Sequence, residues 1–276
     1  MDQLKGKTAV VPGASRPVGR AIAAKLARHG AGLVLPYFDW PESSREMIDE
    51  FQHRGTRFLA ISADLTDEKA IETMMAAVQE EFGSLDYLVN NIERGGMPVV
   101  HGSYSKRHNH EQWDLEVNTT LKAKWLLFQH CLPLLRKVDS AAVVNISSIA
   151  ALVGRSGPAE LLFNEGYSAA NRGVATFTRT WARQGAPNIR VNELMLGLIK
   201  NRHGEHTRGW ACLSESARTG ILDHILIQRT GLPEEVAEAV FFLLHQATYM
   251  TGATIPLDGG YLLGGEKTND MPPGIL

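Results

Sequence analysis

The sequence has few cysteines and no long apolar run, and both absences narrow the classes of protein it can belong to. Its 2 cysteines, Cys131 and Cys212, lie far apart and in no metal-binding or redox spacing. This excludes a disulfide scaffold and is typical of a reducing compartment. No stretch is long enough to span a bilayer, and the first residues lack the apolar core of a signal peptide. We therefore expect a cytoplasmic protein.

An excess of charge of one sign is also lacking. The 28 Lys and Arg residues face 30 Asp and Glu residues, for a formal net charge of -2. This balance gives no indication of nucleic-acid binding or of an anionic membrane surface. With 276 residues, 44% of them hydrophobic, the chain is long enough for one large α/β domain. No repeat, low-complexity tract or linker divides it, so we expect one domain over 1–264 and a tail over 265–276.

What the sequence does contain is an alternation of short apolar runs and helical patterns. We expect strands at 8–11, 33–38, 58–62, 85–89, 142–146, 189–194 and 254–257. We expect helices at 18–29, 41–55, 68–82, 111–136, 167–184 and 233–245. This order is typical of a doubly wound, mostly parallel sheet of seven strands. The segments 92–110 and 197–228 are irregular.

The first strand and helix are joined by a turn that begins with Gly13 and ends with Gly19. A strand, a glycine turn and a helix N-terminus together form an anion site, because free N–H groups and the helix dipole point into the turn. A dinucleotide pyrophosphate is the usual occupant. Pro17 stands where a third glycine is expected. The first helical turn accepts proline, although one N–H group is lost.

In this order, the motifs resemble those of the short-chain dehydrogenase/reductases, and the pattern is similar to their 3-oxoacyl-carrier-protein reductase branch. The resemblance covers roughly 4–263. It rests on the Gly13–Gly19 turn, Asp64-Leu65, Asn90-Asn91, Ser147-Ser148, Tyr167, Ile189-Arg190-Val191-Asn192, Gly197, Thr251-Gly252 and Asp258-Gly259-Gly260. It implies a single-domain Rossmann fold whose substrate lid lies at about 197–228. It also implies an oxidoreductase that interconverts a ketone and a secondary alcohol, such as an acyl thioester or polyketide-like substrate, and that forms a homodimer or homotetramer.

The resemblance further implies a nicotinamide cofactor, with Asp64 near the adenine and Asn91 beside the adenine ribose. We expect NADP rather than NAD, because Arg16 matches a position that often pairs with the 2′-phosphate. Tyr37 occupies the end of the second strand, where an acidic residue would favour NAD; Asp39, two residues on, keeps NAD open. The expected cofactor-binding residues are Gly13, Ser15, Arg16, Val18, Gly19, Tyr37, Phe38, Asp64, Leu65, Asn91, Ile92, Tyr167, Asn171, Gly197 and Ile199.

The catalytic residues implied by the resemblance are Ser148, which orients the substrate oxygen, and Tyr167, which transfers the proton. The family's lysine, four residues after the tyrosine, lowers the pKa of that tyrosine. Here Asn171 stands in its place. The family's asparagine on the long helix is matched in register by Thr120, with Asn118 as the alternative.

Two further features bear on the chemistry. Lys124 lies one helical turn after Thr120 and is a candidate surrogate cation, although a solvated helix lysine is the more ordinary interpretation. Histidines gather at His101, His108 and His110 and again at His203 and His206 without zinc-site spacing, so we expect no metal.

Several departures from the family pattern keep a second function open. Ile92 and Glu93 add bulk beside the cofactor, and Asn201 replaces a threonine that usually meets the nicotinamide amide. With Pro17, Thr120 and Asn171, they favour a cofactor-binding or non-redox member as the alternative to an oxidoreductase. In the segment 197–228, Trp210, Cys212 and Leu213 are candidates to line an apolar substrate pocket.

Overall fold

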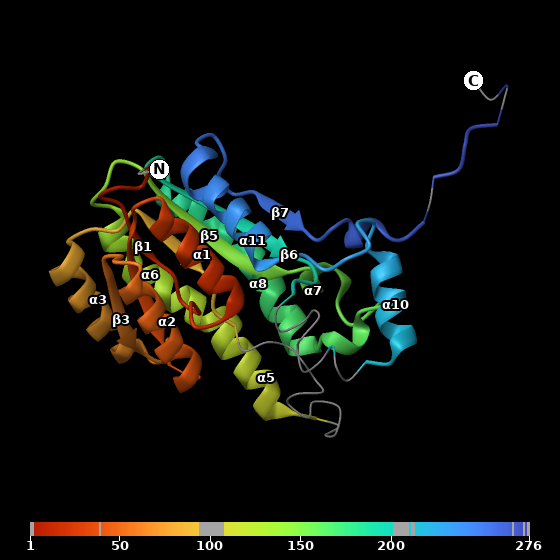
Figure 1. Ribbon diagram of the computed structural model, residues 1–276, viewed down its shortest axis with the longest axis horizontal. Coiled ribbons are helices and arrows are strands. Elements are labelled where there is room, and N and C mark those ends of the chain that lie inside the picture. The colour runs from red at the N-terminus through yellow and green to blue at the C-terminus, as the bar shows by residue number, and fades with distance from the viewer. Residues whose placement is uncertain are drawn as a thin grey trace.

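The apolar runs form one parallel sheet at the centre of the chain (Figure 1). A computed structural model describes residues 3–38, 40–93, 108–200, 210, 213–266, 268–272 and 274. The strands are β1 (Thr8–Val10), β2 (Gly32–Tyr37), β3 (Phe58–Ser62), β4 (Tyr87–Asn90), β5 (Ala141–Ser148), β6 (Ile189–Leu196) and β7 (Thr254–Leu257). Their order is β3-β2-β1-β4-β5-β6-β7 with every neighbouring pair parallel, which confirms the predicted single-domain Rossmann fold.

Helices cover both faces of this sheet. They are α1 (Pro17–Arg28), α2 (Pro41–His53), α3 (Glu68–Phe82), α5 (His110–Glu116), α6 (Ala123–Leu135), α7 (Ala150–Val153), α8 (Glu165–Gly185), α10 (Glu215–His224) and α11 (Pro233–Phe241). One core layer joins α1, α2 and α11 to the sheet, and a second joins α3, α6 and α8 to the other face. Among the described helices, none is long and apolar enough to cross a membrane.

Most predicted elements begin and end within two or three residues of the observed bounds. The long helix is the exception, because its type of helical hydrogen bonding changes along its length. We expected one regular helix over 111–136. Between α5 and α6 the chain instead forms a π-helical segment, Val117–Lys122. A π-helix inserts an extra residue per turn, so it changes which side chains face α8. The helix expected over 233–245 also ends early, and a second π-helical turn, Phe242–Gln246, follows α11.

The strand order reverses between β1 and β4, and this position fixes where a ligand can bind. Successive strands run from β1 outward through β2 and β3, and the chain then returns to the other side of β1. At such a switch point the loops after neighbouring strands separate and leave a crevice at the carboxyl ends of the strands. The Gly13–Gly19 turn follows β1, and residues 91–93 follow β4. Both line this crevice.

The two retained glycines of the turn are required by packing. Gly13 has a φ of +70°, and a Cβ atom there would lie 2.7 Å from the backbone oxygen of Asn91. A Cβ at Gly19 would overlap the carbonyl of Gly13 and lie 2.8 Å from Asn91 Nδ2. The side-chain amide of Asn91 also donates to the carbonyl of Pro12 at 3.2 Å. The turn is therefore pressed against the end of β4 before any ligand is considered.

This packing makes the substitution Gly19→Ala a direct test. We expect the cofactor-free protein to lose about 1–3 kcal/mol of unfolding free energy, because the new methyl group overpacks the turn. Gly220→Ala is the matched control, since nothing lies within 4 Å of a Cβ there and the residue is in α10. That substitution should be neutral or stabilise by about 0.5–1 kcal/mol. Urea unfolding measures both, and equal effects would contradict the packing explanation.

Candidate functional site

Ser148 and Tyr167 come together at the carboxyl end of the sheet. Ser148 is the last residue of β5, and its Oγ accepts a hydrogen bond from the amide of Ala150 at 3.2 Å. Tyr167 lies in the first turn of α8, where its own amide donates at 2.7 Å to the side chain of the N-cap residue Asn164. The two side chains are buried and hydrogen-bonded to each other. The polar pair expected for proton transfer is therefore assembled.

The hydroxyl of Tyr167 has a second partner in Glu93. It donates to Glu93 Oε2 at 3.0 Å, across 74 positions of sequence. Burial raises the pKa of Tyr167 well above its usual range, and the negative charge of Glu93 raises it further, whereas the hydrogen bond with Ser148 lowers it. Tyr167 is therefore held as the neutral phenol. A lysine next to the tyrosine would have the opposite effect on its pKa.

Lys124 corrects one expectation of the sequence, because it is not a solvated helix lysine. Its side chain is 1% exposed, and Nζ donates to the carbonyl of Ile92 at 2.5 Å. Burial lowers its pKa to about 8, while the carboxylates of Glu93, Glu193 and Glu116 oppose that shift. The ammonium group therefore lies among carboxylates, next to the backbone that carries Glu93.

The other two carboxylates around Lys124 have hydrogen-bond donors of their own. Glu193 accepts from the hydroxyls of Ser147 at 2.5 Å and Thr254 at 2.6 Å. Glu116 accepts from the side-chain amides of Gln112 at 2.6 Å and Asn164 at 3.4 Å. Buried carboxyl groups need such partners, because leaving a buried polar group unpaired costs free energy. The site therefore contains a buried, hydrogen-bonded network of charges.

The remaining catalytic candidates lie beside this network. Asn171 is fully buried, and its side-chain nitrogen donates to the carbonyl of Tyr167 at 3.0 Å. Its Oδ1 and the Oγ1 of Thr120, also fully buried, have no hydrogen-bond partner among the described residues. Asn118 is exposed and lines the large cavity described next. Thr120 is thus the more buried of the two alternatives, and its role stays a prediction.

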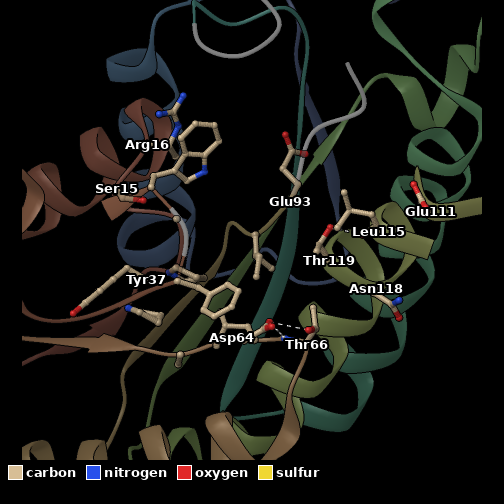
Figure 2. A pocket seen from close by; sticks show the side chains of 18 residues that line it. Ser15, Arg16, Tyr37, Asp64, Thr66, Glu93, Glu111, Leu115, Asn118 and Thr119 are labelled. Atoms are coloured by element: carbon tan, nitrogen blue, oxygen red, sulfur yellow. Dashed lines mark hydrogen bonds between the residues drawn. The ribbon is translucent and has the colours of Figure 1, made fainter. Parts of the chain in front are cut away.

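A cavity of about 350 Å³ opens beside the Gly13–Gly19 turn. In Figure 2, Ser15 and Arg16 lie on one side, Glu111, Leu115, Asn118 and Thr119 lie on the other, and Glu93 stands between them. Among the predicted cofactor residues, its lining contains Gly13, Ser15, Arg16, Tyr37, Phe38, Asp64, Leu65 and Ile92. Most of the residues predicted at the adenosine end therefore surround one space, whereas Asn91, predicted beside the adenine ribose, lines the smaller space described below.

The chemistry of this lining fits the adenosine end of a dinucleotide. The guanidinium of Arg16 lies 4.5 Å from the ring centre of Trp40, which places a cation and an aromatic face at the rim. Phe38 is 57% exposed there. Asp64 accepts from the amide and hydroxyl of Thr66 at 2.9 Å and 2.7 Å, so its carboxylate shapes the turn after β3. Asp64 also lines the cavity, so it can stabilise this turn and contact a ligand at the same time.

The nicotinamide end is much more restricted. A separate space of about 40 Å³ lies against Ser148 and Tyr167. The other predicted cofactor residues in its lining are Val18, Asn91, Gly197 and Ile199. Glu93 belongs to the linings of both spaces. A space of this size holds a few water molecules and no aromatic ring. In this conformation the lining of the large cavity fits the adenosine end of a dinucleotide, and the small space, which Glu93 also lines, is too small for a nicotinamide ring.

Several other residues singled out from the sequence have a different place or lie outside the described residues. Trp210 and Leu213 are buried in the same core cluster as Tyr167. Among the described residues, no three His, Cys, Asp or Glu side chains form a potential metal site. The predictions made for Asp39, His101, Asn201, His203, His206 and Cys212 fall outside the residues that the structure describes.

Two residues that shape the site are missed by the sequence interpretation. Trp40 has a φ of 63°, in the left-handed region, and stacks on Arg16. Nothing in the sequence indicates this contact, because a residue before proline is ordinarily extended and Arg16 lies 24 positions away. Asn164 falls in the long loop before Tyr167 and has no role in the sequence interpretation. An asparagine three residues before Tyr167 is a typical N-cap, and this signal could have placed the tyrosine in the first helical turn.

Comparisons with known proteins agree with this geometry. The family model described as enoyl-(acyl carrier protein) reductase matches residues 13–262. A 3-oxoacyl-[acyl-carrier-protein] reductase of Staphylococcus aureus is 32% identical over 256 residues, which is 92% of this chain and 97% of that protein. The corresponding reductase of Thermotoga maritima is 30% identical over 265 residues, covering 95% of this chain and 100% of that protein.

A solved structure shows the same fold. The short-chain dehydrogenase/reductase from Serratia marcescens superposes with a TM-score of 0.79 at 26% identity, covering 94% of this chain and 99% of that one. The match to the family model, the two reductases and the parallel sheet with its Ser148–Tyr167 pair lead to one conclusion. The chain belongs to the short-chain dehydrogenase/reductase family of oxidoreductases, in its 3-oxoacyl-carrier-protein reductase-like branch.

Proposed function

We propose that the protein is an NADP(H)-dependent oxidoreductase that interconverts a ketone and a secondary alcohol. The observation that carries this proposal is the buried Ser148–Tyr167 pair at the carboxyl end of the sheet, beside the cavity for a nucleotide. The bound nicotinamide would supply or accept the hydride. Ser148 would orient the substrate oxygen by a hydrogen bond, and Tyr167 would donate or accept the proton at that oxygen.

Retention of the proton on Tyr167 favours the reductive direction. Reduction needs a neutral phenol as the proton donor, and burial, the largest cause of the raised pKa of Tyr167, keeps the phenol protonated at neutral pH without a contribution from Glu93. Oxidation needs the phenolate as a base, which the same surroundings disfavour. The relatives named 3-oxoacyl-[acyl-carrier-protein] reductases support a β-keto thioester, or a polyketide-like ketone, as the first substrate class to examine.

The preference for NADP is supported by the rim of the large cavity. Arg16 lines the same cavity as Tyr37 and Phe38, and its guanidinium would recognise the 2′-phosphate of NADP by charge. Among the described residues at the end of β2, neither Tyr37 nor Phe38 supplies the carboxylate that would hold the ribose hydroxyls of NAD. We therefore propose NADPH as the working cofactor.

Lys124 is proposed as a positioning residue that acts through Glu93. Its ammonium attracts the Glu93 carboxylate electrostatically and holds the preceding carbonyl of Ile92. It thereby compensates part of the negative charge that faces Tyr167. The cation that the sequence lacks at Asn171 is thus present nearby, on α6 instead of α8.

A homodimer or homotetramer is proposed on the same resemblance. Leu126, Phe128 and Leu132 are buried in the core of this chain, so they do not contribute to an interface. Trp113 and Trp125, on the stretch from α5 to α6, are 47% and 43% exposed. Large exposed aromatic side chains are enriched at protein interfaces, so these two are the candidates for contacts with a second copy.

The second candidate function is a cofactor-binding member that does no redox chemistry. Glu93 favours it, because its side chain accepts the hydrogen bond of the Tyr167 hydroxyl and lines the small space that a nicotinamide would have to enter. Asn171, which supplies no charge, agrees with it. Both candidate functions require a bound nucleotide, but only the oxidoreductase converts a substrate.

Nucleotide titration followed by a substrate panel distinguishes them. We expect NADPH to bind more tightly than NADH, as measured by nicotinamide fluorescence, and to be oxidised with a β-keto thioester, a cyclic ketone or a quinone. Tyr167→Phe should lower the rate by roughly 10²–10⁴-fold, because it removes the proton donor. Tyr249→Phe is the control, since Tyr249 is fully exposed. Binding without turnover would favour the second candidate, and no binding of either nucleotide at millimolar concentration would contradict both.

The pH dependence of the rate tests the role of Lys124. Its ammonium is present below a pKa of about 8 and is lost as the pH rises through that value, which leaves Glu93 uncompensated. We expect kcat/KM for reduction to fall above about pH 8, by at most roughly tenfold per pH unit, and to level off near the rate of Lys124→Met. Lys124→Met should be slow and lack this decline. Lys122→Met, at an exposed neighbouring position, should retain it. A wild-type profile in Lys124→Met would refute the assignment.

A further inference from the structure

Glu93 stands at the boundary between the two spaces of the site. It follows β4 by three residues and accepts the hydroxyl hydrogen bond of Tyr167 at 3.0 Å. Its side chain lines both the cavity of about 350 Å³ and the space of about 40 Å³ against Ser148. Figure 2 shows it between Arg16 and Glu111. A side chain in this place separates the adenosine end of the site from the proton-transfer pair.

Both partners of the Tyr167–Glu93 hydrogen bond are fixed by buried groups. Tyr167 is held at its amide by the N-cap Asn164 and at its hydroxyl by Ser148. On the other side, Lys124 binds the carbonyl of Ile92, directly before Glu93, and attracts its carboxylate. The contact therefore connects β4, α6 and α8, and it is not the chance position of a surface side chain. Breaking it costs a charge-assisted hydrogen bond inside the protein.

We propose that Glu93 is a built-in competitor for the nicotinamide end of the cofactor, so that the site accepts an adenosine phosphate as it stands and accepts the nicotinamide only after the Tyr167–Glu93 hydrogen bond opens. This inference rests on the proposed function, because it assumes that the larger cavity binds the adenosine end. Family membership does not imply this property of Glu93. Because of it, binding of the nicotinamide end carries a free-energy cost that binding of the adenosine end does not.

The inference predicts an unusual affinity ratio. In an open site the nicotinamide end adds contacts, so the dinucleotide binds more tightly than its adenosine fragment. Here those contacts are offset by the hydrogen bond that must open. The wild-type protein should therefore bind adenosine 2′,5′-bisphosphate within about threefold of NADPH. Removing the carboxylate should tighten NADPH by roughly 10-fold to 100-fold, as expected for one charged hydrogen bond.

Isothermal titration of four proteins with both ligands tests this ratio. Glu93→Gly removes the competitor, and Glu93→Gln keeps its size without its charge. We expect both to gain affinity for NADPH, the glycine variant more, with the affinity for adenosine 2′,5′-bisphosphate unchanged. Glu165→Gln is the matched control, because it removes one negative charge from the exposed first turn of α8 without contacting Tyr167. It should behave as the wild type.

The outcomes separate this inference from the proposed function. NADPH that binds much more tightly than the fragment to the wild type, with the same ratio in both Glu93 variants, overturns the competitor and leaves the cofactor site standing. Failure of both ligands to bind to all four proteins overturns the proposed function itself. The same ratio is measured for ADP and NADH, which lack the 2′-phosphate, so that the comparison of fragment with dinucleotide does not depend on that group. Thermal melting of each variant confirms that it is folded. If Glu93→Gly does not fold, the comparison of Glu93→Gln with the wild type is the test.

Discussion

The hydrogen bond from Tyr167 to Glu93 is the interaction on which the interpretation of this site depends. It joins the end of β4 to the first turn of α8 and lies between the nucleotide cavity and the Ser148–Tyr167 pair. In the family, a neighbouring lysine makes the catalytic tyrosine more acidic. Here burial and a carboxylate raise the pKa of Tyr167, so the same phenol is held in its neutral form.

The charges around this hydrogen bond explain why so many polar groups are buried together. Lys124 is surrounded by Glu93, Glu116 and Glu193. Burying charges costs free energy even when they are paired, so a network of this kind adds little to stability compared with apolar packing. Such clusters of perturbed ionisable groups are found at functional sites. The position of this network, at the switch point of the sheet, agrees with a role in chemistry or ligand binding.

Much of the fold could be predicted from the sequence, because local patterns determine it. The bounds of β3, α3 and β7 follow directly from apolar runs and from caps such as Asp67, and the glycines of the first turn correctly indicate where β1 ends and α1 begins. The π-helical segment could not be predicted, since its hydrophobic pattern is close to that of a regular helix. Counting residues favours Thr120 over Asn118, but both lie in this π-helical segment, where the regular helical spacing behind such counting does not hold.

The candidate site could be predicted only in part. Ser148 and Tyr167 were recognisable because each belongs to a local motif. The burial of Lys124 was not, because a single lysine in a helix is usually solvated, and its partners Ile92, Glu93 and Glu193 come from distant parts of the chain. The bulk of Glu93 beside the cofactor was visible in the sequence. Its contact with Tyr167 was not, because it joins residues 74 positions apart.

The most direct measurement is a pair of crystal structures, determined without a nucleotide and with NADP⁺. This account predicts that Glu93 contacts the hydroxyl of Tyr167 in the first structure. In the second, it predicts that the Glu93 carboxylate has moved away and that the nicotinamide lies against Tyr167 and Ser148. If NADP⁺ is bound with its nicotinamide against Tyr167 while the Tyr167–Glu93 hydrogen bond is intact, Glu93 does not compete with the cofactor and the account is contradicted.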